Sequence, residues 1–356
     1  GSIVNGAVNF DVLAANGAEA VITGEVNPVA NSNNYQVIYM IYGVQGANKG
    51  KPLAERRGIT TNPNQLRQAA HLVSDRTYEL LTGQRGAFRT RIAYIVYRHG
   101  DRFPYQLMTA DYDGYNEVPI LRSTEPIMTP NWSPDGKRLV YVSFEKRAPT
   151  IYVQDIFSKE RTKLSSFPGL NSSPTWSPDG NKIAFTLSKD GQPEIYYYDL
   201  VSGKYNRVTN NRAIDTEPAW SADSKRIFFT SERGGRAQIY AVNIDTKEAQ
   251  RITYQGAMNL SSRPIPGSDA LIVITRQNGY RVARVDKDGS IYMLTTSSLD
   301  ESPSVAPNGS MVIYSTVYQG RKGLALVSTD GRFKANLPSS NRGEISAPAW
   351  GPLPEK

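Results

Sequence analysis

Pro174-Thr175-Trp176-Ser177-Pro178-Asp179-Gly180 is one of six related stretches that recur along this 356-residue chain. The other copies begin at Pro130, Pro218, Ser262, Pro303 and Pro348, so successive copies are 44, 44, 44, 41 and 45 residues apart. A steady period of about 40 to 45 residues indicates a repeat protein, because each unit must stack on its neighbours to bury its apolar face.

Each repeat unit predicts four short strands. In the unit that spans residues 174–217, the first strand opens the unit, and turn residues separate it from strands at 182–187, 195–200 and 206–209. Four strands per period, without a helical spacing of apolar residues, are typical of a β-propeller blade. The tryptophans of the repeat are expected to pack between blades: Trp132, Trp176, Trp220 and Trp350.

Six copies predict a six-bladed β-propeller over residues 87–356. Too few residues follow Pro348 to complete a blade, whereas segments 91–96 and 105–111 resemble second and third strands that lack a first strand. We therefore expect the C-terminal strand to pair with segment 91–96, which closes the ring and leaves no inner edge exposed.

Residues 1–86 predict a small α/β domain before the propeller. Segments 20–26 and 35–42 resemble strands, and Asn62 and Gly83 bracket a helix. Gly1-Ser2 resembles the scar of a removed cloning tag, so we expect the natural N-terminus to be missing. One face of the helix is predicted to carry Leu66, Ala70, Val73, Thr77 and Leu80.

Composition argues against several classes of function. The net charge is +8, but the basic residues are dispersed and not interleaved with stacking aromatic residues, which favours a solvated surface over a nucleic-acid site. No apolar run reaches 18 residues, so no membrane span is expected. The chain has no cysteine, no Gly-x-Ser-x-Gly motif and two separated histidines, His71 and His99. The sequence therefore predicts neither a catalytic triad nor a zinc site, and we expect no enzyme.

Acidic residues precede several copies of the repeat. Because the first strand of each blade lines the central channel, the segments that lead into these strands should converge at one mouth. Acidic residues there could hold a Ca²⁺ ion near Glu217 and Glu301, anchor a basic segment of a partner, or be ordinary loop residues.

Four segments of the chain resemble the TolB family of the bacterial Tol-Pal system. They are 81–83 (Leu-Thr-Gly), 85–94 (Arg-Gly-Ala-Phe-Arg-Thr-Arg-Ile-Ala-Tyr), 111–116 (Asp-Tyr-Asp-Gly-Tyr-Asn) and 328–335 (Ser-Thr-Asp-Gly-Arg-Phe-Lys-Ala). The resemblance covers essentially the whole chain, and segment 85–94 is its most specific part. The order of a small α/β domain followed by six blades also matches the family.

The resemblance implies a non-enzymatic, monomeric periplasmic adaptor. Family members bind the peptidoglycan-associated lipoprotein Pal at the propeller mouth and engage TolA through an N-terminal extension. We expect this extension and the opening part of the α/β domain to be missing here. Capture of Pal keeps it from peptidoglycan, supports outer-membrane integrity and couples inner-membrane energy to constriction at division. Translocation segments of colicins use the same mouth.

Geometry and resemblance together predict the residues that contact the partner. The predicted contact residues are Leu170, Asn171, Ser172, Ser173, Asp215, Thr216, Glu217, Asn259, Leu260, Ser261, Leu299, Asp300 and Glu301.

The sequence leaves two other functions open: a regulatory propeller of a peptidase-type hydrolase, and a propeller that binds or cleaves glycans.

Overall fold

The computed structural model describes residues 3–4, 7–338 and 343–355. Gly1-Ser2, the predicted cloning scar, lies outside the described residues. The chain divides into two compact units, residues 1–89 and residues 90–356. The boundary expected from the sequence, between residues 86 and 87, falls in the segment that links the last helix of the first unit to the first strand of the second.

The N-terminal unit contains a three-stranded antiparallel sheet in the order β3-β4-β5. It also has two short strands and a long helix that ends at Gly83, which adopts a left-handed φ of 73°. The bounds are β1 (Ile3–Val4), β2 (Ala7–Val8), α1 (Phe10–Ala15), β3 (Ala20–Pro28), β4 (Tyr35–Gly43), η1 (Gly46–Asn48), β5 (Arg57–Thr61), η2 (Pro63–Gln65) and α2 (Leu66–Thr82).

The face predicted for α2 is buried only in part, because Thr77 is buried while Ala70 and Leu80 are exposed. The buried residues of the helix are Ala69, His71, Asp75 and Thr77, whereas Leu80 is 41% exposed. The carboxylate of Asp75 accepts hydrogen bonds from the Phe88 amide at 2.7 Å and from Arg89 Nε at 3.1 Å. The Asp75 carboxylate can be buried because these hydrogen bonds replace the ones that it would make with water.

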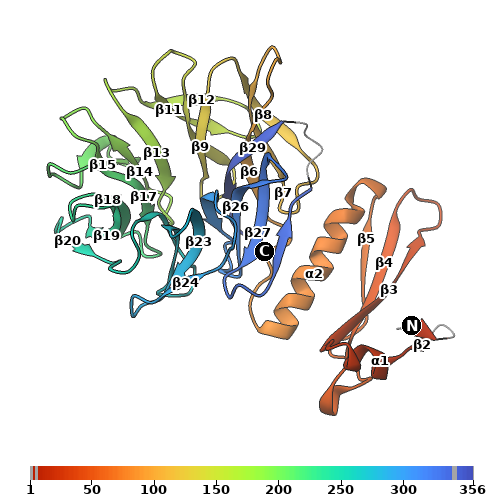
Figure 1. The fold of residues 1–356 in the computed structure, drawn as a ribbon. Coiled ribbons are helices and arrows are strands. Elements are labelled where there is room, and N and C mark those ends of the chain that lie inside the picture. The colour runs from red at the N-terminus through yellow and green to blue at the C-terminus, as the bar shows by residue number, and fades with distance from the viewer. Residues whose placement is uncertain (1–2, 5–6, 339–342, 356) are drawn as a thin grey trace. The chain divides into compact units, whose positions relative to one another are not determined.

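Residues 90–356 form six four-stranded antiparallel sheets, as the repeat predicts (Figure 1). From the inner to the outer strand, the blades are β9 (Ile127–Trp132), β10 (Arg138–Ser143), β11 (Thr150–Asp155), β12 (Arg161–Ser165); β13 (Asn171–Trp176), β14 (Lys182–Leu187), β15 (Glu194–Asp199), β16 (Lys204–Arg207); β17 (Asp215–Trp220), β18 (Arg226–Ser231), β19 (Gln238–Asn243), β20 (Ala249–Arg251); β21 (Asn259–Pro264), β22 (Leu271–Arg276), β23 (Tyr280–Val285), β24 (Ile291–Met293); β25 (Glu301–Val305), β26 (Met311–Tyr318), β27 (Arg321–Ser328), β28 (Lys334–Asn336); and β29 (Glu344–Trp350), β6 (Arg91–Tyr97), β7 (Tyr105–Asp111), β8 (Val118–Ser123).

The last strand of the chain supplies the inner strand of the blade that begins the propeller. β29 pairs antiparallel with β6, and Ile345 lies opposite Val96 while Trp350 lies opposite Ile92. Figure 1 shows β29, in blue, beside β6. β29 also contacts the inner strands on both sides, β25 and β9, so the six blades form a closed ring.

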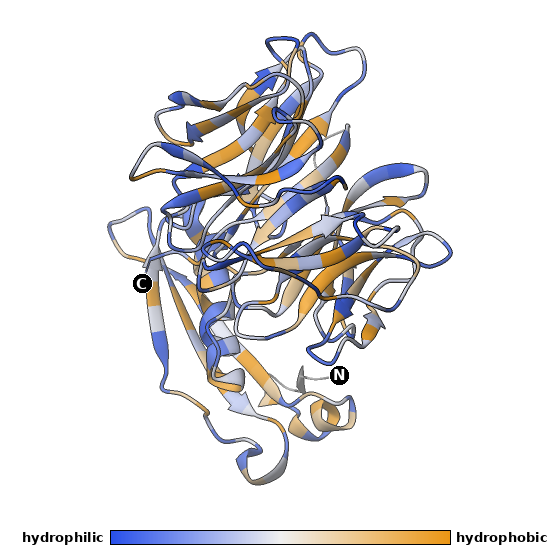
Figure 2. Cartoon of the chain, turned by 90° about the vertical axis from the view of Figure 1, so that its left-hand side faces the viewer, coloured by the Kyte–Doolittle hydropathy of each residue, from blue (hydrophilic) through white to orange (hydrophobic). Residues whose placement is uncertain are grey.

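The apolar core lies between the blades. One cluster joins Val140 and Val142 of β10 to Phe185 of β14 in the next blade, and Trp176 completes it. Figure 2 shows apolar residues concentrated on the strands and hydrophilic residues in many connections. All four repeat tryptophans are buried, as predicted, with 5 to 8% of each side chain exposed. The indole N–H groups of Trp132 and Trp220 each donate to a carbonyl of the preceding blade, those of Ala349 and Thr175.

The Ser-x-Asp turns connect the first and second strands of a blade, at the end of the ring opposite the loops that lead into the inner strands. In one of them the Ser177 hydroxyl donates to Asp179 at 2.6 Å, and the Asn181 amide donates to the same oxygen at 2.9 Å. Burial alone would raise the pKa of Asp179, but these two bonds and Lys182 outweigh it and hold the pKa below the usual value. Asp135 and Asp223 make equivalent bonds, and their pKa values are also lowered.

Candidate functional site: the propeller mouth

Every inner strand contains a β-bulge next to the channel. In β17, for example, the register with β18 shifts between Thr216 and Ala219, and Glu217 has a φ of 55°. The equivalent residues of the other blades also have positive φ: Thr129, Ser173, Ser261, Ser302 and Ala347. Such a conformation is strained for a residue other than glycine, so its sixfold repetition shows that the ring geometry imposes it.

The bulge residues line a narrow cavity of about 90 Å³ on the channel axis. Glu217 accepts hydrogen bonds there from the Ser261 hydroxyl at 2.5 Å, from the Ser261 amide at 2.9 Å and from Thr230 at 2.8 Å. Arg263 also faces this cavity. Desolvation lowers the pKa of the Arg263 guanidinium, and the nearby Glu217 partly offsets this effect. The guanidinium keeps its charge at neutral pH, because an arginine pKa lies far above 7.

Four of the predicted contact residues are buried, and this corrects their assignment. Asn171, Asp215, Asn259 and Asp300 have 0 to 1% of their surface exposed. They occupy equivalent positions, at or just before the start of β13, β17, β21 and β25. A docked protein cannot touch these side chains, so we assign them a structural role.

The buried polar residues shape the loops at the mouth. Asp215 accepts hydrogen bonds from Asn211 Nδ2 at 2.6 Å and from Arg233 at 2.7 Å. Asn171 accepts one from the Ser165 hydroxyl and donates one to the carbonyl of Phe167, both at 2.7 Å. Each residue thus ties the loop before an inner strand to that strand, which makes the mouth a rigid surface.

An apolar residue comes directly before each buried polar residue. These four residues, Leu170, Ile214, Met258 and Leu299, are termed the apolar rim below. Ile214 is 39% exposed and Leu299 is 57% exposed, while Leu170 and Met258 are half-buried. The sequence predicted contact for Leu170 and Leu299 but missed Ile214 and Met258. The 44-residue spacing of Leu170, Ile214 and Met258 is the signal that could have identified them.

The remaining predicted contact residues lie in the inner strands and not in loops. Ser172, Ser173, Thr216, Glu217, Leu260 and Ser261 are half-buried in β13, β17 and β21. Glu301 is exposed at the start of β25 and forms an ion pair with Lys322.

The two acidic residues proposed to bind a Ca²⁺ ion, Glu217 and Glu301, interact with different side chains of the protein. Glu217 accepts its bonds from Ser261 and Thr230, and Glu301 pairs with Lys322. Among the described residues, no group of three or more His, Cys, Asp or Glu side chains is arranged to hold a metal ion. The Ca²⁺ ion stays a prediction.

Comparisons with known proteins agree on one family. A family model described as "TolB beta propeller domain" matches residues 78–354. The Tol-Pal system protein TolB of Mannheimia succiniciproducens is 54% identical over 98% of this chain and 79% of its own length. The TolB protein of Pasteurella multocida is 56% identical over 97% of this chain and 79% of its own. The chain belongs to the TolB family.

Solved structures support the same family. The crystal structure of TolB from Acinetobacter baumannii matches with a TM-score of 0.88 and 39% identity, over 98% of this chain and 86% of that one. Membership of the TolB family makes the chain a cell-envelope component of the Tol-Pal system. Within the described residues, no helix combines the length and hydrophobicity that crossing a membrane requires.

Proposed function

We propose that this member of the TolB family is a non-enzymatic, monomeric periplasmic adaptor whose propeller mouth binds the lipoprotein Pal. The observation that carries the proposal is the apolar rim, which four consecutive blades present at equivalent positions. Ile214 and Leu299 are exposed while Leu170 and Met258 are half-buried, and apolar side chains that gather at one opening are typical of a protein-binding surface.

The geometry of the mouth suits a globular partner. A partner that buries a standard interface of about 1,600 Å² would cover the mouth and meet the rim near its centre. The hydrogen-bonded loops below the rim are already ordered, so binding loses little conformational entropy. The half-buried Ser172, Thr216 and Leu260 then lie under the partner rather than at its edge.

The wider role follows from family membership. We assign coupling to TolA to the N-terminal region of the family. Binding of Pal at the mouth would withdraw Pal from peptidoglycan and so support outer-membrane integrity and constriction during division. Translocation segments of colicins would compete for the same rim.

Calorimetric titration with soluble Pal tests the proposal. Ile214→Asp and Leu170→Asp each place a charge where an apolar contact is expected, and we predict that affinity falls by about 30-fold or more, as for a hot spot worth at least about 2 kcal/mol. The matched control is Val201→Asp, which introduces the same charge at an apolar residue that is 82% exposed in the β15–β16 turn, on the opposite face.

The two faces give opposite expectations. Val201→Asp should leave the affinity for Pal within about twofold of that of the parent. All three variants should have a Tm close to that of the parent, because they change exposed or half-buried residues. Loss of binding in Val201→Asp, with retention in Ile214→Asp and Leu170→Asp, would place Pal on the other face and refute the proposal.

A further inference from the structure

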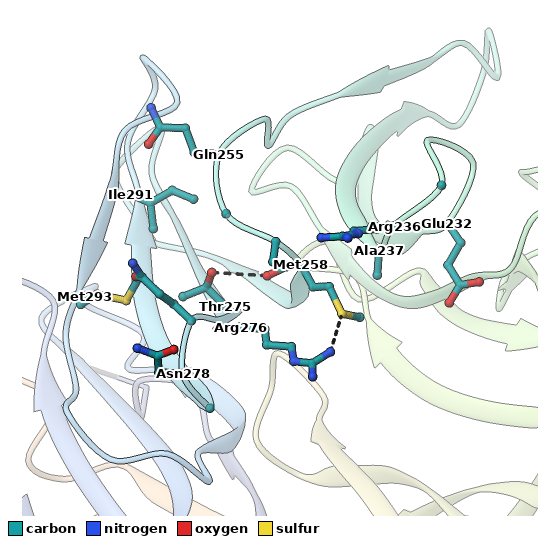
Figure 3. A pocket seen from close by; sticks show the side chains of 15 residues that line it. Glu232, Arg236, Ala237, Gln255, Met258, Thr275, Arg276, Asn278, Ile291 and Met293 are labelled. Atoms are coloured by element: carbon teal, nitrogen blue, oxygen red, sulfur yellow. Dashed lines mark hydrogen bonds between the residues drawn. The ribbon is translucent and has the colours of Figure 1, made fainter.

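A large pocket opens between two neighbouring blades, away from the channel axis. Its volume is about 1,030 Å³, and Figure 3 shows its lining. The β18–β19 hairpin forms one wall, the β22–β23 hairpin and β24 form the other, and the connection from β20 to β21 lies between them. Met258 belongs to both this pocket and the apolar rim, so the pocket runs from the mouth towards the outermost strand of a blade.

Two arginines that line the pocket form no ion pair with a carboxylate in the described part of the chain. Arg236 and Arg276 are exposed on hairpins of adjacent blades, and Figure 3 shows Met258 between them. No carboxylate among the described residues lies within 4.0 Å of either guanidinium. Arg276 contacts the thioether of Met258 at 3.8 Å and the ring of Tyr280 at 6.0 Å, and neither contact neutralises its charge.

Within the residues that the structure describes, two other arginines of the same blades form ion pairs, unlike Arg236 and Arg276. Arg233, in the same hairpin as Arg236, forms an ion pair with Asp215 at 2.7 Å, and Arg284 in β23 pairs with Asp286 at 2.8 Å. Two guanidinium groups that remain free on facing walls can bind carboxylates through paired hydrogen bonds.

The rest of the lining mixes polar residues with apolar, adaptable ones. Met258, Ile291 and Met293 line the pocket, and Met293 is 39% exposed. Methionine side chains adjust to irregular apolar groups. In an extended peptide, successive side chains point to opposite sides, so acidic residues can reach the arginines while apolar residues meet the methionines.

We propose that this pocket binds an extended, acidic and partly apolar peptide segment of a partner protein. The pocket volume is at the upper end of the range for small-molecule sites, about 300 to 1,000 Å³, which leaves room for several residues of an extended chain. The site shares Met258 with the apolar rim, but its two arginines lie outside the rim residues.

Fluorescence anisotropy tests the proposal with a short labelled peptide that alternates glutamate and leucine. We expect this peptide to bind, and we expect its affinity to fall as added salt screens the charges. Arg236→Gln and Arg276→Gln should each reduce affinity about tenfold, the effect of losing one charge-assisted hydrogen bond. The matched control is Arg212→Gln, because Arg212 is an exposed arginine that does not line the pocket. It lies in the β16–β17 connection, which corresponds, one blade earlier, to the β20–β21 connection of the pocket.

Two substitutions test the sign of the charge effect. Ala257→Glu adds a negative charge to an exposed lining residue and should weaken binding, while Glu232→Gln removes the acid of the lining and should strengthen it. A peptide that alternates glutamine and leucine should bind at least tenfold more weakly. Equal affinity for the two peptides, or no binding of the glutamate peptide, would overturn the proposal.

Two further measurements complete the test: the binding of other anions to the pocket, and the affinity of a pocket variant for Pal. If inorganic tripolyphosphate or a heparin oligosaccharide binds with the same arginine dependence and the glutamate peptide does not, the pocket is a general polyanion site and the peptide proposal is wrong. Arg236→Gln should leave the affinity for Pal unchanged, and a loss of Pal binding would overturn the proposal of a separate peptide site. Conversely, normal Pal binding by Ile214→Asp would refute the mouth proposal without affecting this one.

Discussion

Replacing Trp220 by alanine tests whether packing between blades stabilises the propeller. Trp220 is 5% exposed, meets Tyr197 edge to face at a centroid distance of 6.0 Å, and donates its indole N–H to the Thr175 carbonyl of the preceding blade at 3.2 Å. Trp220→Ala removes the ring, leaves a cavity between two blades and removes the indole donor from the partly buried Thr175 carbonyl.

The expected loss can be worked out from these contacts. A buried aromatic side chain accounts for about 150 to 250 Å², which at about 25 cal/mol per Å² corresponds to about 4 to 6 kcal/mol before alanine recovers part of it. Substitution of large buried aromatic residues by alanine typically destabilises by about 3 to 5 kcal/mol. We therefore expect the free energy of unfolding to fall by about 4 kcal/mol and the Tm to fall by about 8 to 15 °C.

Urea denaturation followed by tryptophan fluorescence and circular dichroism measures the effect. Trp220→Phe keeps most of the ring but not the N–H donor, so it should lose only about 1 to 2 kcal/mol. Tyr254→Ala is the matched control, because Tyr254 is an aromatic residue that is 69% exposed in a nearby loop, and its removal should change stability by less than about 0.5 kcal/mol. If Trp220→Ala were as stable as Tyr254→Ala, the indole would not be a core group and the reasoning would fail.

Two further predictions concern ring closure and acid. Deleting residues 348–356 removes the part of β29 that pairs with Ala93 and Ile92, so the propeller should unfold cooperatively, and an unchanged thermal melt by circular dichroism would contradict the closure. Asp135, Asp179 and Asp223 have lowered pKa values in the folded protein, so their contribution to stability is present above about pH 4 and is lost as the pH falls through those lowered values. The variant with asparagine at all three positions should be less stable at pH 7 but lose less stability between about pH 4.5 and 2.5, and parallel stability curves for variant and parent would exclude this role.

The repeat period, the turn residues and the strand-like segments were sufficient to predict a six-bladed propeller after a small α/β unit. These features are local, because turn chemistry and strand periodicity depend on residues close in sequence, and a fixed period then determines how many units stack. The segment around Arg85 to Tyr94 likewise indicated the family that the comparisons show.

The exposure of particular side chains depended on tertiary packing. From sequence, Asp215 was expected to contact a partner and the adjacent Ile214 was not considered, yet Asp215 is buried and Ile214 is 39% exposed. Asp215 lies inside because Asn211 and Arg233, which the fold brings beside it, compensate its desolvation. The same reason explains α2, where Asp75 is buried and Leu80 is exposed. Hydrophobicity alone assigns these positions incorrectly, because burial of a charge depends on partners that only the folded chain assembles.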